Sequence, residues 1–187
     1  MADGIVGYRT WEILLFKDEH PVHGISDEDF WNAIRTFKGA SKRLELVGKN
    51  TQTAVYKDFA HAPSKLKATI SAMKEQYPDR KLVACMELHT FSSLTEEFLQ
   101  QYAGSMDRAD LPVVYFNPHA LEHKKLPPLD PEKVRKSFCN SKISVYSDSS
   151  LLQGFLREQN WQNANLLMMS SGNFDGIDFA KLAESIL

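Results

Sequence analysis

Short apolar runs alternate with amphipathic stretches along most of this chain. The amphipathic stretches carry apolar residues at helical spacing, as at Leu66, Ile70 and Met73, and Pro63 suits a first helical turn. Strands separated by helices of this length need right-handed crossovers, which build a parallel sheet. We therefore predict an α/β fold, a Rossmann-like three-layer sandwich with a mainly parallel sheet of about six strands and helices on both faces. The expected strands are 44–47, 54–58, 81–86, 113–116, 143–146 and 166–169.

The turn and helix signals between these runs sharpen the prediction. Gly48-Lys49-Asn50-Thr51 separates the first two strands and favours a hairpin between them. Helices are expected over 26–39, 63–76, 95–102, from Asp130, after Asp148 and over 178–186, and the first of them has Ser26 as its N-cap. The residues expected to face inward on the helix after Asp148 are Leu151, Leu152, Phe155 and Leu156. A further short strand is expected at 11–16, and loops at 17–24 and 117–123.

Composition excludes several classes of protein. The 187 residues are 43% hydrophobic and 25% charged with a net charge of −2, which is ordinary for a globular domain and leaves no basic face for nucleic acid. No apolar stretch reaches the roughly 20 residues that a membrane-spanning helix needs. Two distant cysteines, Cys85 and Cys139, form no disulfide framework. We expect a protein of the reducing cytoplasm that binds neither nucleic acid nor membrane.

The fold itself selects the loops that matter for binding. In open parallel sheets, ligands bind beyond the carboxyl ends of the strands. The loops at those ends are 58–63, 87–93, 117–123 and 170–173. In the first of them, Asp58 and His61 could bind sugar hydroxyls, a phosphate or a carboxylate. The alternative is that Asp58 caps the next helix and His61 is a surface residue.

Four stretches carry a resemblance to a known family. Asp58-Phe59-Ala60-His61-Ala62-Pro63 resembles the D-[YF]-[AG]-H-x-P signature of the C-terminal domain of Mur ligases, and residues 37–45 resemble the F-x-G-x-x-x-R-x-E run that opens this domain. Residues 87–92 resemble the family loop E/Q-P-H-x-[YF]-[ST], and residues 169–174 resemble its final strand and loop. The resemblance covers residues 25–187. It leaves residues 1–24 as a linker, a remnant of the central domain, or sequence added outside the domain.

The resemblance implies an activity for the full-length protein. Mur ligases use ATP to convert the lactyl carboxylate of a UDP-N-acetylmuramate precursor to an acyl phosphate, which the amine of an amino acid or peptide then attacks. The C-terminal domain closes over ATP and binds the amine substrate, while the central domain holds most of the triphosphate and Mg²⁺. The implied partners are the N-terminal and central domains, UDP-N-acetylmuramate, and L-alanine or a murein peptide, in peptidoglycan synthesis or recycling.

The family's motifs also imply roles for individual residues. Arg43 is expected to meet a phosphate of ATP, a pairing that suits a guanidinium, and Asp58 is expected to bind the ribose hydroxyls. The implied amine-substrate residues lie in three loops: His61, His89, Thr90, Ser93, Ser170, Ser171, Gly172 and Asn173. Arg43 could instead form a surface ion pair with Glu45, and Ser170 and Ser171 could simply form a tight turn. We expect no catalytic residue in this domain alone, and no metal site.

Two departures from the family pattern limit the resemblance. The sequence contains no G-x-x-x-x-G-K-[ST] loop to hold a triphosphate, so we expect the isolated chain to be inactive. Family members that add L-alanine carry two arginines after the loop histidine, where this chain has Thr90 and Ser93. The choice between L-alanine and a murein peptide therefore stays open.

Three other interpretations remain. Histidines of the strand-end loops could bind a metal together with Asp58 and Glu87, although no tight ligand spacing supports this: His61, His89, His119 and His123. The chain could be a stand-alone, non-catalytic module that binds a nucleotide or a peptide. A dinucleotide-binding domain is the weakest alternative, because the G-x-G-x-x-G fingerprint is missing.

Overall fold

The computed structural model describes residues 26, 28, 29, 32 and 43–187. The chain divides into two units, Met1–Ser41 and Lys42–Leu187, and the fold described below is that of the second. In the first unit, the Ser26 hydroxyl accepts a hydrogen bond of 3.1 Å from the backbone N–H of Asp29, which confirms Ser26 as a helix N-cap. The expected strand at 11–16, the loop at 17–24 and the rest of the helix to Gly39 lie outside the described residues.

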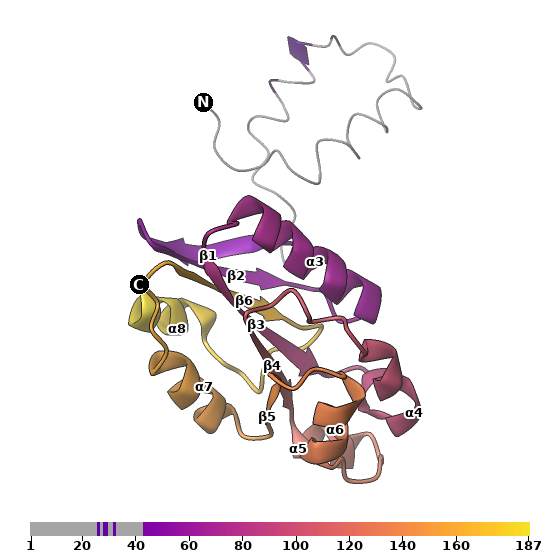
Figure 1. Cartoon of the computed structure of the whole chain (residues 1–187). Helices are drawn as coiled ribbons and strands as arrows, with labels where there is room; N and C mark the ends of the chain where they lie inside the picture. The colour runs from indigo at the N-terminus through magenta and orange to yellow at the C-terminus, as the bar shows by residue number, and fades with distance from the viewer. Residues whose placement is uncertain (1–25, 27, 30–31, 33–42) are drawn as a thin grey trace. The chain divides into compact units, whose positions relative to one another are not determined.

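A six-stranded sheet forms the centre of the second unit, in the order β1-β2-β6-β3-β4-β5 (Figure 1). The edge strand β1 pairs with β2 in the antiparallel sense, as the hairpin signal predicted, and every other pairing is parallel. The last strand in the sequence thus inserts between β2 and β3. The strands are β1 (Glu45–Lys49), β2 (Thr53–Asp58), β3 (Lys81–Leu88), β4 (Leu111–Phe116), β5 (Ser144–Tyr146) and β6 (Ala164–Met169).

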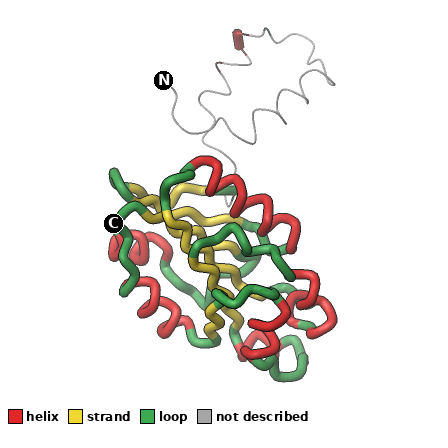
Figure 2. The backbone as a smooth tube through the Cα atoms, in the orientation of Figure 1, coloured by secondary structure: helices red, strands yellow, loops and turns green. Residues whose placement is uncertain are grey.

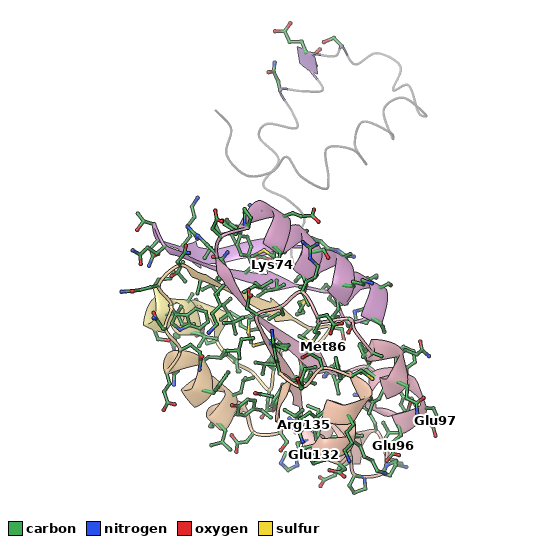
Figure 3. All side chains as sticks on the ribbon, viewed as in Figure 1. Lys74, Met86, Glu96, Glu97, Glu132 and Arg135 are labelled. Atoms are coloured by element: carbon green, nitrogen blue, oxygen red, sulfur yellow. The ribbon has the colours of Figure 1, made fainter. Side chains whose placement is uncertain are left out.

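Helices cover both faces of this sheet, which confirms the expected three-layer α/β architecture (Figure 2). One face is covered by α3 (Pro63–Gln76), α4 (Glu96–Leu99), α5 (Pro118–His123) and α6 (Pro131–Ser137). The other is covered by α7 (Ser149–Arg157) and α8 (Phe179–Ile186). Lys133 of α6 forms an ion pair of 2.7 Å with Glu96, which ties α6 to α4, and Figure 3 labels Glu96 beside Glu132 and Arg135.

Alternation along the central strands builds two separate cores. In β3, Met86 packs into the core beneath α3, and Cys85 packs into the core beneath α7 and α8; Figure 3 labels Met86 at the centre of the sheet. In β6, Leu167 and Leu166 divide in the same way. Successive side chains of a strand point to opposite faces, so continuous apolar runs fill both layers of a sheet that is covered on both sides.

Three expectations about the helices were wrong in detail. Leu151 is 66% exposed, whereas Leu152 and Leu156 are buried and Phe155 packs against the same core, because positions three and four apart share one face of a helix. The segment 95–102 contains the short helix α4 followed by a 3₁₀ turn, Gln100–Tyr102, rather than one continuous helix. The expected loop at 117–123 forms α5, which begins because Asn117 accepts a hydrogen bond from the N–H of His119 and Pro118 occupies the first turn.

No helix among the described residues is long and apolar enough to cross a membrane.

Candidate functional site

The carboxyl ends of the four central strands meet at one edge of the sheet. Asp58 of β2 is paired in register with Met169 of β6, which is also paired with Met86 of β3. Leu88 of β3 is paired in turn with Phe116 of β4. The loops that follow these four strands therefore lie at the same edge, as the parallel topology predicted.

A buried carboxylate holds two of these loops together. Glu87, the next-to-last residue of β3, is 2% exposed. Its Oε2 accepts hydrogen bonds from the hydroxyl of Ser170 and, at 2.9 Å, from the backbone N–H of Phe174. The Ser170 hydroxyl in turn accepts a hydrogen bond of 2.6 Å from the N–H of Gly172. A buried carboxylate is tolerated only with such donors, so Glu87 fixes the loop after β6 against β3.

Gly172 lies directly against the side chain of His89. A Cβ atom at Gly172 would stand 2.7 Å from Cγ of His89 and 2.8 Å from Oε2 of Glu87, so any larger residue would force these side chains to shift. His89 Nδ1 lies 3.6 Å from Oε1 of Glu87, which orients the imidazole beside the carboxylate. The close approach of Gly172 therefore sets the position of the ring of His89 at the edge of the sheet.

The next turn has an uncommon backbone. Phe174, Asp175 and Gly176 have φ angles of 52°, 58° and 79°, all in the left-handed region. For the two non-glycine residues this conformation is costly, and such strain concentrates at functional sites. The turn is held because Phe174 is fully buried and stacks on the ring of Tyr115, with centroids 5.9 Å apart. It places the Asp175 carboxylate where the side-chain N–H of Asn117 donates to it at 2.9 Å.

A cavity of about 240 Å³ opens between these loops and α5, and we call it the rim cavity. Its lining combines two carboxylates, two side-chain amides, three imidazoles and one alanine: Glu87, Asp175, Asn117, Asn173, His89, His119, His123 and Ala120. His119 and His123 are four residues apart on α5, so they lie on the same side of the helix. A second, mainly apolar cavity of about 210 Å³ lies between α5 and the segment 126–131.

Both carboxylate oxygens of Asp58 accept hydrogen bonds from backbone N–H groups. Asp58 is 8% exposed, and its two oxygens accept hydrogen bonds from the N–H groups of Leu44, at 2.6 Å, and Ala60, at 2.7 Å. Leu44 has a left-handed φ of 42°, so this contact secures a strained residue next to Arg43. Asp58 does not cap α3, whose N-cap is Ala62. Asp58 therefore fixes the turn that presents Arg43.

Arg43 and His61 both lie against the ring of Phe59. The guanidinium carbon of Arg43 is 5.8 Å from the centre of the Phe59 ring, and the His61 ring meets Phe59 edge-on at 5.0 Å. His61 Nδ1 lies 2.8 Å from the carbonyl oxygen of Phe59. Arg43, which precedes the β1 hairpin, and the loop after β2 thus form a compact unit, in which a cation and an imidazole are both held beside Phe59.

The structure brings only some of the predicted substrate residues to the rim cavity. His89 and Asn173 line it, and Gly172 packs against His89. Ser93 is 1% exposed, and its hydroxyl donates to the carbonyl oxygen of Thr90, so these two residues shape their own turn. The hydroxyl of Ser170 donates its hydrogen bond to Glu87. The buried hydroxyl of Ser171 has no hydrogen-bond partner among the described residues.

The sequence selected the loop 117–123 for binding but did not predict helix α5, and it gave no sign of Asp175 in the left-handed turn. Asn117, His119 and His123 were assigned to a loop, although Asn117-Pro118 directly after a strand is an N-cap followed by a favoured first residue of a helix. Asp175 carries no such local signal, because its direction depends on the turn at Phe174. Burial, with the nearby charges of Asp175 and Glu87, raises the pKa of Tyr115 beneath this turn to about 12.

The geometry gives no support to the metal-site interpretation. Across residues 43–187 and the four described residues before them, no three His, Cys, Asp or Glu side chains are placed to hold one ion. His61 also lies outside the lining of the rim cavity, apart from the other three histidines that the interpretation would combine.

Comparisons with known proteins agree with the motifs at this edge. The model of the family "Mur ligase, glutamate ligase domain" matches residues 42–171. A UDP-N-acetylmuramate–L-alanine ligase of Lactococcus lactis is 33% identical over 117 residues, which are 60% of this chain and 26% of that protein. The corresponding ligase of Cytophaga hutchinsonii is 33% identical over 87 residues, 46% of this chain and 18% of that protein. This chain thus spans about a quarter, or less, of the length of these relatives.

Solved structures show the same fold. A murein peptide ligase from Psychrobacter arcticus superposes with a TM-score of 0.64 at 24% identity, covering 87% of this chain and 33% of that one. A single domain from Haemophilus ducreyi, assigned to a UDP-N-acetylmuramate:L-alanyl-γ-D-glutamyl-diaminopimelate ligase, is 26% identical with a TM-score of 0.57. That match covers 78% of this chain and 100% of the Haemophilus domain. The family model covers more than half of the chain, and the chain belongs to the Mur ligase, glutamate ligase domain family.

Proposed function

We propose that this chain is the C-terminal domain of an ATP-dependent ligase that joins an amine substrate to UDP-N-acetylmuramate, in peptidoglycan synthesis or recycling. The observation that carries the proposal is the shared edge of the sheet, where the Arg43–Phe59–His61 unit and the rim cavity both lie at the carboxyl ends of parallel strands. The names of the relatives, which are UDP-N-acetylmuramate–L-alanine ligases, support this choice of reaction. The domain's task is to complete a site that begins in the other domains of the full-length enzyme.

The first half of that task is to contact ATP. In this proposal the guanidinium of Arg43 binds a phosphate, because its planar set of donors suits phosphate oxygens. Each carboxylate oxygen of Asp58 accepts one hydrogen bond from a backbone N–H group. The remaining lone pairs can accept hydrogen bonds from the ribose hydroxyls. Asp58 also positions Arg43 through the N–H of Leu44. Mg²⁺ and most of the triphosphate belong, in this proposal, to the central domain.

The second half is to place the amine. The rim cavity offers His89 and Asn173 from the predicted set, with Asn117 and Asp175 beside them. Attack on an acyl phosphate needs the amine to be held in line and needs charge on the phosphate to be offset, which are tasks of placement rather than of covalent chemistry in this domain. The isolated chain is therefore expected not to turn over. Both cysteines are free thiols, which suits the reducing cytoplasm where we place this reaction.

A chimaera tests this function. Residues 42–187 would replace the matching C-terminal part of the Lactococcus lactis relative, behind that protein's own N-terminal and central domains. We expect phosphate release from ATP that requires both UDP-N-acetylmuramate and an amine drawn from a panel of amino acids and murein peptides. The same two domains without any C-terminal part, and this chain alone, are the two negative controls.

Variants of the chimaera test the nucleotide half. Arg43→Ala should raise the KM for ATP by about tenfold, the effect of losing roughly 1.4 kcal/mol of binding. Lys57→Ala is the matched control. Lys57 is a cation of the neighbouring strand β2, and its ammonium forms an ion pair of 2.9 Å with Glu45. A chimaera that folds but never releases phosphate with any amine in the panel would count against the proposed function.

A further inference from the structure

We infer that the rim cavity recognises an alkylammonium group of the amine substrate, and that Asp175 is the residue that selects it. This inference rests on the proposed function and names the class of amine substrate. The substrate carries a primary ammonium on an aliphatic chain, and the cavity binds this ammonium rather than a carboxylate of the substrate. Of the described residues that line the cavity, none is lysine or arginine. A carboxylate would enter a site that already holds the carboxylates of Glu87 and Asp175, and like charges in one site repel.

The two carboxylates have different tasks. Glu87 is 2% exposed, its Oε2 is used by the loop after β6, and its Oε1 lies 3.6 Å from Nδ1 of His89, so Glu87 acts on the cavity mainly through its charge. Asp175 is exposed, and the donors that its oxygens meet, Asn117 at 2.9 Å and Ser149 at 3.4 Å, are neutral. Its negative charge is therefore still available for a cationic ligand.

The remaining lining suits the N–H groups of an ammonium. The side-chain amide of Asn173 can offer an oxygen, and a neutral imidazole offers one ring nitrogen as an acceptor, so His89, His119 and His123 can each take one hydrogen bond. An ammonium has three donors to satisfy, and a cavity with acceptors on several sides can meet them together.

The small volume of the cavity and the fixed position of Asp175 favour a short ligand. The cavity of about 240 Å³ is below the roughly 300 Å³ at which pockets for drug-sized molecules begin. Asp175 is held in the left-handed region between buried Phe174 and Gly176, so its carboxylate is placed before any ligand arrives. Pre-organisation of this kind reduces the ordering cost of binding.

Two probes of equal length and opposite charge test the inference. Amide resonances of the ¹⁵N-labelled 187-residue chain would be followed while 1,5-diaminopentane or glutarate is added at low salt. We expect the diamine to shift resonances of residues 117–123 and 173–176 at millimolar concentration, and the shifts to shrink as salt is raised. Glutarate should leave these resonances unchanged.

Asp175→Asn supplies the decisive variant. Asparagine tolerates the left-handed region and its amide oxygen can still accept from Asn117, so the turn should survive, which an unchanged denaturation midpoint would verify. Its affinity for the diamine should fall at least tenfold. Asp79→Asn, an exposed acid that precedes β3 at the opposite end of the strand, is the matched control and should bind the diamine unchanged.

Three results would overturn the inference: glutarate binds the cavity in place of the diamine, Asp175→Asn binds the diamine as well as the parent chain does, or neither probe shifts these resonances. None of them bears on phosphate release by the chimaera. Failure of the ammonium site is therefore distinguishable from failure of the ligase function.

Discussion

The backbone N–H of Phe174 donates a hydrogen bond of 2.9 Å to the buried carboxylate of Glu87, across 87 residues of sequence. This contact joins the end of β3 to the turn after β6, and the hydroxyl of Ser170 shares the same carboxylate oxygen. Phe174 begins the left-handed turn that directs Asp175 into the rim cavity. The shape of the candidate site therefore depends on one buried acid.

Glu87→Gln should be tolerated, whereas Glu87→Leu should not. The amide oxygen of glutamine can accept from both Ser170 and Phe174, but leucine leaves both donors buried without a partner. We expect Glu87→Leu to lower the free energy of unfolding by about 2–4 kcal/mol and Glu87→Gln by less than about 1 kcal/mol. Urea denaturation of the three proteins measures this. Equal losses in both variants would contradict the role given to these two hydrogen bonds.

Gly172→Ala should disturb the loop, while the same substitution at Gly154 should not. The new Cβ at Gly172 would stand 2.7 Å from the ring of His89, whereas nothing lies within 4 Å of a Cβ at Gly154 in helix α7. We expect a loss of about 1–3 kcal/mol for Gly172→Ala from overpacking. Gly154→Ala should gain about 0.5–1 kcal/mol from helix propensity. Thermal unfolding checks the opposite signs, and two shifts of the same sign would count against the close approach.

Asp110 should make stability depend on acid pH. Burial acts to raise the pKa of Asp110, but hydrogen bonds of 2.8 Å from Lys74 and from the N–H of Leu82 outweigh it and hold the pKa below its ordinary 3.8. A pKa lowered by folding stabilises the protein above the unfolded value, and that stability is lost as pH falls through the folded value.

The test of Asp110 is the variant Asp110→Asn. We expect it to lower the free energy of unfolding by about 1 kcal/mol at pH 7, a figure reduced for solvent screening because the Asp110 side chain is 43% exposed. The difference from the parent should vanish below the folded pKa of Asp110. Urea titrations between pH 7 and pH 2 measure it, and a gap that persists unchanged to pH 2 would exclude this linkage.

Leu152 and Leu151 should differ sharply in their effect on stability. Leu152 is fully buried against the sheet, while Leu151 is 66% exposed on the other side of α7. Leu152→Ala should cost about 2–5 kcal/mol, because it removes buried apolar area and leaves a cavity. Leu151→Ala should change the free energy of unfolding by no more than about 0.5 kcal/mol. Comparable losses for the two variants in denaturant titrations would contradict this placement of α7.

Much of the fold could be predicted because its signals are local. Leu66, Ile70 and Met73 lie within one helix, and their spacing alone identifies the buried face of α3. The antiparallel hairpin of β1 and β2 follows from the turn residues between two apolar runs. The shared edge of Asp58, His89 and Ser170 follows from a general rule, because the carboxyl ends of parallel strands lie at the same side of a sheet.

The sequence alone determined the six strands, the long helix α3 and which loops could meet, since side-chain periodicity is set within a few residues, but it did not reveal helix α5. Only the tertiary structure decided that β6 enters between β2 and β3 and that Glu87 captures the turn at Phe174. It also decided that Ser93 points inward and Asp175 toward the cavity. Such directions depend on contacts between residues far apart in the chain, and no local pattern encodes them.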